Sequence, residues 1–230
     1  MFQHYIYDAS SKQEIFSEEL LELTKGLNKI VEDSKTPLEG NLFYLNHRRR
    51  QTLVNGNTTI PDAVYTTKRA NFANLIKQKN FIVEIGFNAG HSALFALTVN
   101  PQIRYFGIDI ARYPYTKSCA TYLQNKFGNR FECQFGDSMK VFPLYALRNL
   151  LESDLIHIDG GHSIEMFTID ICHAIMLPNS SGIDRHILVD DAKSKPILEK
   201  IRELEKLGYV MVVKDFVKWE GEGNLLLKVC

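Results

Sequence analysis

Acidic side chains follow several apolar runs of this 230-residue sequence. Asp109, Asp137, Asp159 and Asp190 each end such a run or lie just beyond it, and Asp191 comes next. In an open α/β sheet, ligands bind outside the carboxyl ends of the strands. If the apolar runs are strands of one sheet, the carboxylates converge on one edge, where they could bind a ligand.

Asp159, Asp190 and Asp191 have the chemistry of a metal site. Carboxylates without cysteine or clustered histidine suit a hard cation such as Mg²⁺. Three neighbouring acids also repel one another at neutral pH unless a cation or bound protons compensate. We predict a divalent-cation site here, with the alternative that Asp191 simply caps the next helix.

His162 is the candidate proton acceptor. It follows Asp159-Gly160-Gly161 at the expected start of a helix, and the two glycines let the backbone approach a ligand closely. A helix N-terminus disfavours imidazolium and keeps the ring able to accept a proton. A single histidine is more often structural, but the neighbouring acids favour catalysis. We expect His157 to be a buried structural residue and His91 to lie near a cofactor.

The stretch from Phe81 to Ser92 predicts a buried strand that enters a helix through a glycine turn. A nicotinamide fingerprint needs Gly-x-Gly-x-x-Gly, but Asn88 and His91 occupy its second and third glycine positions. The spacing of Gly86 and Gly90 therefore favours a nucleoside cofactor without a pyrophosphate, and the sequence contains no P-loop signature.

Three further acidic positions could serve this cofactor. Asp109 lies just over 20 residues beyond the turn, where an acid binds ribose hydroxyls, although a helix cap or surface acid is the alternative. Asp137 and Ser138 precede a helix, so the alternative for either residue is that it caps this helix and has no role in cofactor binding. We expect Glu84 to orient the backbone of the turn.

Alternating patterns predict the fold. Apolar strand patterns alternate with helical ones, which indicates βαβ units and a parallel sheet covered on both faces. The expected strands are 104–109, 131–135, 154–159 and 185–190, and the expected helices are 12–33, 64–79, 90–99, 115–127, 139–151, 162–176 and 195–207. Residues 208–213 and 224–229, joined by a glycine-containing connection, predict a hairpin with one antiparallel strand.

Length and composition limit the organisation and the partners. The length suits one domain, which we place at 64–230 behind an N-terminal helical and loop cap at 1–63. Equal numbers of basic and acidic residues, 27 each, argue against a nucleic-acid binder. Arg48–Arg50 is a solvated loop or a clamp for an anionic substrate group. No apolar run is long enough for a membrane span.

The four cysteines show no paired spacing, which favours a reducing, cytoplasmic setting without disulfides or zinc. Cys133 and Cys172 lie in apolar runs and are expected in the core.

Three segments resemble motifs of the class I S-adenosylmethionine-dependent methyltransferases. Glu84–Ser92, Ile156–Ser163 and Leu188–Asp191 are similar, in order and separation, to motifs of the metal-dependent O-methyltransferase branch, which includes catechol, caffeoyl-CoA and macrocin-type enzymes. The resemblance covers about residues 64–229. It implies a Rossmann-like, doubly wound sheet of seven mostly parallel strands, whose last strand is antiparallel.

The resemblance also implies roles for single residues. Those at the methionine end of the cofactor are Gly86, Asn88, Gly90 and Ser92. Asp109 would bind the ribose, and the residues beside the adenine are Asp137, Ser138 and Met139. Glu84 and Asp159 complete the cofactor set, and Asp159, Asp190 and Asp191 match the metal ligands. His162 stands where the catechol and caffeoyl-CoA enzymes have a catalytic lysine, a departure that leaves the identity of the base open.

The implied function is methyl transfer from S-adenosylmethionine to a hydroxyl of a small molecule such as a phenol, a sugar or a natural product, assisted by Mg²⁺ or another divalent cation. The alternatives are a catalytically inactive cofactor-binding protein of the same fold and a nicotinamide-dependent oxidoreductase. An RNA methyltransferase using Arg48–Arg50 is disfavoured by the neutral total charge. A homodimer is left open. Aromatic residues that could line the acceptor pocket or belong to the core are Tyr44, Tyr65, Tyr113, Tyr115 and Trp219.

Overall fold

The computed structural model describes residues 4–39, 41–45, 58, 60–146, 150, 152–161, 163–178, 182–190, 192–214 and 224–230. The predictions for Arg48–Arg50, His162, Asp191, Trp219 and the connection at 220–223 lie outside these residues. Contacts divide the chain into two compact units. The helical unit comprises residues 1–78, 87–104 and 111–132, and the sheet unit comprises residues 79–86, 105–110 and 133–230.

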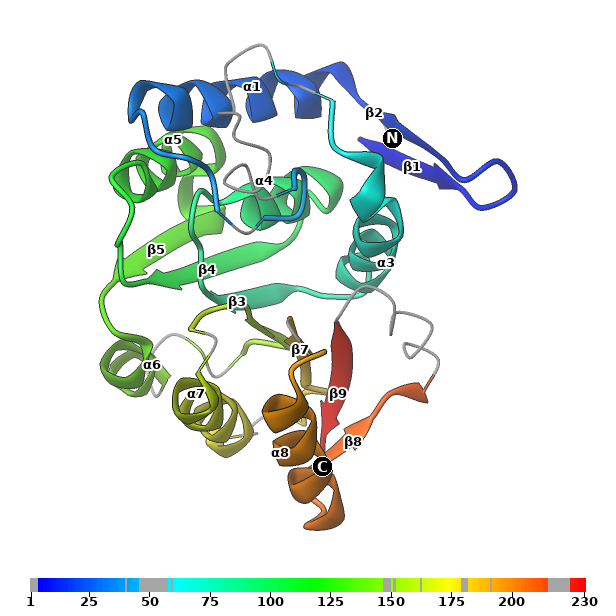
Figure 1. The fold of residues 1–230 in the computed structure, drawn as a ribbon, viewed down its shortest axis with the longest axis vertical. Coiled ribbons are helices and arrows are strands. Elements are labelled where there is room, and N and C mark those ends of the chain that lie inside the picture. Colours follow the sequence, from blue (N-terminus) through cyan, green and yellow to red (C-terminus); the bar gives the residue numbers. More distant parts are fainter. Residues whose placement is uncertain are drawn as a thin grey trace. The chain divides into compact units, whose positions relative to one another are not determined.

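The sheet unit is built on a seven-stranded sheet in the order β5-β4-β3-β6-β7-β9-β8 (Figure 1). The strands are β3 Phe81–Ile85, β4 Arg104–Asp109, β5 Phe131–Phe135, β6 Leu155–Ile158, β7 His186–Val189, β8 Val210–Val212 and β9 Leu225–Val229. Strand β6 runs parallel to β3 and β7, whereas β9 is antiparallel to both β7 and β8. The predicted fold class, including its antiparallel strand, is confirmed.

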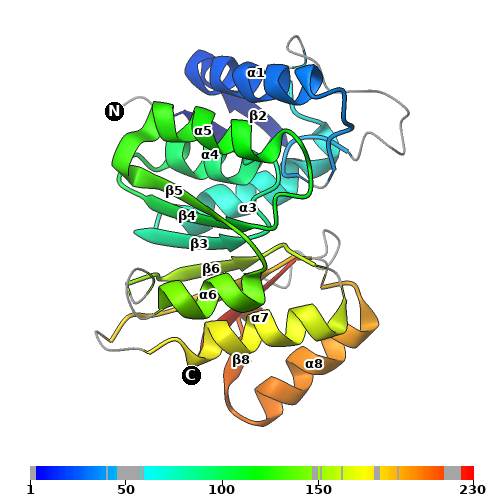
Figure 2. The ribbon, with the colours of Figure 1, turned by 90° about the vertical axis from the view of Figure 1, so that its left-hand side faces the viewer.

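Side-chain alternation directs one set of apolar residues to the face of the sheet that three helices cover. Val83 and Ile85 of β3 and Ile156 and Ile158 of β6 belong to one buried core, to which the helices contribute apolar residues as well. These helices are α6 Ser138–Ala146, α7 Ile164–Met176 and α8 Lys195–Lys206, which lie beside one another in Figure 2. Because successive side chains of a strand point to opposite faces, Glu84 and His157 lie on the other face.

Two buried charged residues anchor the starts of the strands. The carboxylate of Asp154, just before β6, accepts hydrogen bonds from the backbone N–H groups of Asn80 at 2.8 Å and Phe81 at 3.1 Å. The guanidinium of Arg185 donates to the carbonyl oxygens of Ser153 at 3.0 Å and Leu177 at 2.7 Å. These bonds satisfy backbone groups that the sheet ladder does not reach.

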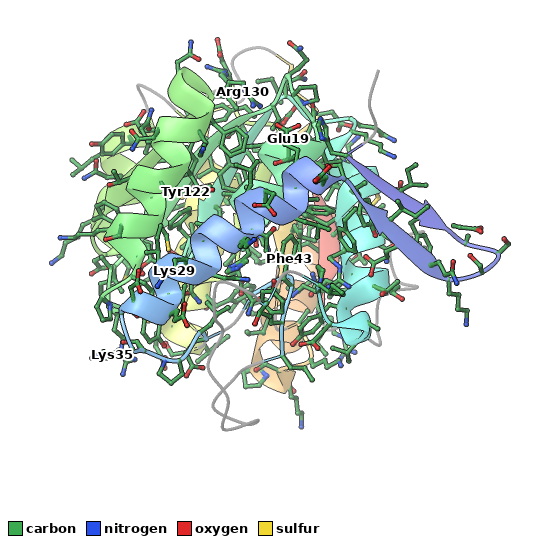
Figure 3. All side chains as sticks on the ribbon, turned by 90° about the horizontal axis from the view of Figure 1, so that it is seen from above. Glu19, Lys29, Lys35, Phe43, Tyr122 and Arg130 are labelled. Carbon is green, nitrogen blue, oxygen red and sulfur yellow. The ribbon has the colours of Figure 1, made fainter. Side chains whose placement is uncertain are left out.

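The helical unit contains a hairpin, β1 Tyr5–Asp8 and β2 Gln13–Phe16, and the helices α1 Glu18–Asp33, α3 Thr66–Ile76, α4 His91–Val99 and α5 Thr116–Phe127. Two short 3₁₀ turns, Ala63–Tyr65 and Gly128–Arg130, adjoin α3 and α5. Helix α1 packs on α4 and α5, and the hydroxyl of Tyr122 in α5 donates a hydrogen bond to the carbonyl oxygen of Leu23 in α1 (Figure 3). Among the described helices, none combines the length and apolarity that crossing a membrane requires.

The predicted helix at 12–33 is wrong in its first turn. Gln13–Phe16 forms a strand that pairs with Tyr5–Asp8. The helix begins after Ser17, whose hydroxyl accepts a hydrogen bond from the N–H of Leu20 at 3.2 Å. A serine cap stops the helix from extending backwards because it holds its own backbone extended. The helix expected at 64–79 is also shorter, ending at Ile76.

The cysteines are placed differently from the prediction. Cys119 is buried, whereas Cys133 and Cys172 are only partly buried. All four are free thiols. The proposed boundary between a cap at 1–63 and a domain at 64–230 stays a prediction.

Candidate active site at the carboxyl edge of the sheet

The strand order reverses between β3 and β6. From β3 the chain proceeds outwards through β4 to β5, and then returns to the other side of β3 as β6. Such a reversal opens a crevice outside the carboxyl ends of the two central strands, which is where doubly wound sheets bind ligands. Gly86 follows β3 and Asp159 follows β6, so both lie at this point.

The acids predicted for one edge follow neighbouring strands. Asp109 ends β4, Asp159 and Asp190 come directly after β6 and β7, and Asp137 lies two residues beyond β5. Asp109, Asp159 and Asp190 are each partly exposed. The fold therefore brings carboxylates from widely separated parts of the chain to the same edge of the sheet.

Gly86 lies against the backbone of Asp159. The N–H of Asp159 donates to Ile85 at 2.8 Å, and the N–H of Gly86 donates to Ile108 of β4 at 2.8 Å. A Cβ atom on Gly86 would lie 2.0 Å from the carbonyl oxygen of Asp159, and the residue has a φ of 102°. Only glycine accommodates both constraints.

The turn after β3 contains three left-handed residues. Gly86, Asn88 and Gly90 have φ values of 102°, 54° and 79°. Asparagine tolerates this region better than other side chains do. Helix α4 begins directly afterwards at His91, whose side chain is buried, and Ser92 is buried as well.

Buried polar side chains lie in a row across three neighbouring strands. Glu84, His157 and Tyr105 are exposed by only 0%, 3% and 1%, and Glu84 and His157 are register partners in β3 and β6. His157 Nδ1 lies 3.2 Å from Glu84 Oε1. Burial lowers the pKa of His157, but the hydrogen bond and the charge of Glu84 outweigh it, so the pKa is raised. Burial, then the Glu84 carboxylate, raises the pKa of Tyr105.

This row was missed by the sequence analysis, which treated Glu84 and His157 separately. The burial of His157 is confirmed. The sequence did contain a signal for this pair. Glu84 lies two residues before Gly86, and His157 lies two residues before Asp159, so the two polar side chains occupy equivalent positions in their strands.

The described residues also contain a group with metal-binding geometry. One ligand atom each of Glu84, His157 and Asp159 lies within 4.8 Å of the others. This group shares only Asp159 with the predicted metal ligands. Of the predicted ligands, Asp159 and Asp190 follow adjacent strands, and Asp191 lies outside the described residues. The predicted site at Asp159, Asp190 and Asp191 stays a prediction, as does the catalytic role of His162.

The start of α6 follows the carboxyl end of β5. Asp137 accepts a hydrogen bond from the N–H of Met139 at 3.1 Å, so it caps the helix, one of the alternatives considered for it. Ser138 is buried beside Asp170 of α7, a carboxyl group exposed by only 1%. Burial raises the pKa of Asp170 to about 6, against the hydrogen bond of Ser138. Asp170 was not singled out from the sequence, where it looks like one polar position of an amphipathic helix.

The predicted pocket aromatics divide between two environments. Tyr44 and Tyr115 are buried in the helical unit, whereas Tyr65 and Tyr113 are partly exposed. Tyr113 stacks on Tyr115 with ring centroids 5.4 Å apart. Tyr44 and Tyr115 are therefore core residues, one of the two alternatives considered for them.

Residues 83–192 match a protein family described as "Methyltransferase domain". Residues 83–192 therefore carry a methyltransferase domain. The matched range includes the glycine turn, the strand ends of β4, β5 and β6, and Asp190, so it contains all three motifs that carried the resemblance. The prediction of a methyltransferase is confirmed.

Solved structures show that the methyltransferase domain has the fold of known O-methyltransferases. The O-methyltransferase TomG of Streptomyces achromogenes, solved in complex with S-adenosylmethionine, is 15% identical, with a TM-score of 0.54 and coverage of 94% of this chain and 91% of TomG. An O-methyltransferase of Bacillus cereus, solved with S-adenosylhomocysteine, is 13% identical, with a TM-score of 0.56 and coverage of 94% and 92%. No curated protein sequence matches the chain.

Proposed function

We propose that this protein transfers a methyl group from S-adenosylmethionine to a hydroxyl group of a small molecule. The observation that carries the proposal is the meeting of Gly86 and Asp159 where the strand order reverses, within a methyltransferase domain. TomG and the Bacillus cereus enzyme, which share the fold, bind S-adenosylmethionine and S-adenosylhomocysteine.

The residues at the carboxyl edge fit this cofactor. Asp109 ends β4 and is partly exposed, so its carboxylate can accept hydrogen bonds from the two ribose hydroxyls. Asp137, Ser138 and Met139 would border the adenine. The residues for the methionine end are Glu84, Gly86, Asn88, Gly90, Ser92 and Asp159. When bound, S-adenosylmethionine supplies a methyl group on a positively charged sulfur, ready for transfer to an oxygen.

A divalent cation fits Asp159 and Asp190. Both carboxylates are partly exposed and follow adjacent parallel strands, and their oxygens are the ligands that Mg²⁺ prefers. Asp191 would be the third ligand. Such a cation would polarise the acceptor hydroxyl and lower its pKa.

His162 is the proposed base. It would accept the hydroxyl proton while the surrounding residues orient the oxygen towards the methyl group and exclude water. The glycines before it, Gly160 and Gly161, carry no side chains that would keep an acceptor away.

Calorimetry with S-adenosylhomocysteine and with NAD tests the cofactor assignment. We expect only S-adenosylhomocysteine to bind. Asp109→Ala should weaken its binding by roughly tenfold or more, since a charge-assisted hydrogen bond is worth about 1.5–3 kcal/mol. Asp184→Ala replaces an exposed acid two residues before β7; it is the matched control and should bind as the wild type does. Binding of NAD instead would favour the oxidoreductase.

Methyl transfer to a panel of phenols, sugars and hydroxy acids, followed by mass spectrometry, tests the reaction. A methylated product that disappears in His162→Ala supports the base assignment. Cofactor binding without transfer to any acceptor would favour the inactive cofactor-binding protein.

A further inference from the structure

Residues from the N-terminal part of the chain hold the glycine turn at Asn88. The side-chain amide of Asn88 donates a hydrogen bond to the carbonyl oxygen of Glu39. The hydroxyl of Tyr115, on the segment that enters α5, donates to Asn88 Oδ1 at 2.8 Å. Both polar ends of a side chain with left-handed backbone are therefore bound by groups outside the turn.

A second set of contacts holds the residue that follows the turn. His91 Nε2 lies 3.0 Å from Oδ1 of Asn28 in α1, and because that oxygen is an acceptor, Nε2 is the donor. The amide of Asn28 in turn donates to the hydroxyl of Tyr44 at 2.9 Å and to the carbonyl oxygen of Thr58. Asn28, His91 and Tyr44 are exposed by at most 2%.

Buried networks of this kind are rigid when every member is satisfied, and they lose their geometry when one member is removed. We call residues 28–39 and 41–44 the N-terminal arm. The arm contacts the turn on both sides, at Asn88 through Glu39 and at His91 through Asn28. The conformation of the turn therefore depends on the arm.

We propose that the N-terminal arm and Tyr115 position the turn for cofactor binding, so that cofactor binding and the structure of the arm are coupled. Asn28 and Tyr115 are positioning residues, since they act through Asn88 and His91. The inference rests on the proposed function. Linkage is reciprocal, so an arm that favours binding must itself be stabilised by the bound cofactor. The bound cofactor would thereby stabilise the N-terminal arm.

The first test compares two tyrosine-to-phenylalanine changes on α5 or its start. Tyr115→Phe removes the hydroxyl bound to Asn88. Tyr122→Phe is the matched control, because it removes a hydroxyl that donates to Leu23 of α1 at 3.3 Å, away from the turn. We expect S-adenosylhomocysteine to bind about three- to tenfold more weakly to Tyr115→Phe, the value of one neutral hydrogen bond, and to bind Tyr122→Phe as the wild type. Equal affinities of the two variants would overturn the proposal.

The second test measures hydrogen exchange in the wild type with and without S-adenosylhomocysteine, which needs no variant to fold. We expect slower amide exchange in residues 28–39 and 41–44 when the ligand is bound, and no slowing in the hairpin at 5–16. Unchanged exchange in the arm, despite binding, would overturn the coupling alone. A wild-type protein that binds no S-adenosylhomocysteine would overturn the proposed function and the coupling together.

Discussion

The carbonyl oxygen of Asp159 leaves no room for a side chain on Gly86, so even the methyl group of an alanine at this position should disturb the site. Gly86→Ala should unfold the site or displace Asp159, abolish cofactor binding and cost more than the about 1–3 kcal/mol of a strained φ. Gly128→Ala is the control, since Gly128 has a φ of 58° but no atom within 4 Å of an added Cβ. Calorimetry and urea unfolding of the two variants separate the steric effect from backbone strain. Equal effects would contradict the close approach.

Asp170 predicts a pH dependence of stability. In the folded protein its pKa is about 6, whereas the ordinary value is 3.8. Between these values the folded protein binds more protons than the unfolded chain, so the free energy of unfolding falls as the pH rises. Asp170→Asn lacks this loss. The difference in melting temperature between Asp170→Asn and the wild type should therefore grow in favour of the variant by roughly 3 °C or more from pH 4 to pH 7, measured by thermal denaturation.

Asp184→Asn is the control for this prediction. The hydrogen bond of Lys228 lowers the pKa of Asp184, so that acid stabilises the folded protein above its pKa and the stabilisation is lost as the pH falls. Relative to the wild type, the melting temperature of Asp184→Asn should therefore not rise with pH. A parallel pH profile of Asp170→Asn and the wild type would show that Asp170 titrates normally.

The site residues differ in how far the sequence could predict them. Gly86 and Asp109 are recognisable because their spacing along the chain is fixed by a single strand, turn and helix. The pair of Glu84 and His157 depends on which strands are neighbours and on their register, and 72 residues of chain lie between these two residues. Contacts such as Asn28 with His91 depend on helix packing, which leaves no local pattern.

Among the elements, the hairpin is attached to α3 by a buried ion pair. Arg69 Nη2 of α3 lies 2.6 Å from Glu14 of β2, and their side chains are exposed by 0% and 7%. Tyr5 of β1 donates a further hydrogen bond to Glu14 at 2.8 Å. Burial raises the pKa of Glu14, but the hydrogen bonds of Arg69, Thr66 and Tyr5 and the charge of Arg69 together outweigh burial, so the pKa is lowered.

We expect Arg69→Met to destabilise the protein by about 3–5 kcal/mol, because it leaves the carboxylate of Glu14 buried without a counterion. The double variant Glu14→Leu/Arg69→Met should be less destabilised, since neither charge remains. Lys29→Met, which breaks an exposed ion pair of α1 with Asp33, should leave the free energy of unfolding almost unchanged, because solvent screens exposed ion pairs. Urea unfolding measures all three. An Arg69→Met cost as small as that of Lys29→Met would mean that the pair contributes little.

The same hairpin shows why the sequence predicted the wrong element at its second strand. Ile15, Phe16 and Leu20 have helical spacing with the apolar residues that follow, so periodicity extended the helix backwards. Ser17, a typical helix cap, was the signal against this extension. It became decisive only with the pairing of Gln13–Phe16 and Tyr5–Asp8, which the sequence did not show. Tertiary pairing overrode local spacing.

For the molecule as a whole, the proposed cation predicts separable effects on binding and turnover. Removal of divalent cations with EDTA should lower methyl transfer by tenfold or more and leave the affinity for S-adenosylhomocysteine within about twofold, because a metal-polarised hydroxyl is worth several kcal/mol in the transition state. Added Mg²⁺ should restore turnover. Asp190→Asn should reproduce the effect of EDTA. Full turnover after metal removal would contradict the proposed role of the cation.

The global architecture was more predictable than its details. The alternation of apolar strands with amphipathic helices implies a parallel sheet by itself, and the final two strands without a helix between them imply an antiparallel strand. The order of the strands was not predicted, because the sequence pattern alone does not show on which side of β3 the chain returns. The acids Asp109, Asp159 and Asp190 were nevertheless assigned to one edge, since parallel strands share their direction.

The position of β9 between β7 and β8 affects how the chain folds during its synthesis. β9 is the last of the seven strands to be made, yet it supplies the hydrogen bonds on both sides of the gap between β7 and β8. Until β9 emerges from the ribosome, the side of β7 away from β6 has no partner strand. Because unpaired strand edges promote misassembly, we expect this edge of β7 to be open to wrong partners until β9 pairs with it. Pairing of Leu225–Val229 with both β7 and β8 would then complete the sheet.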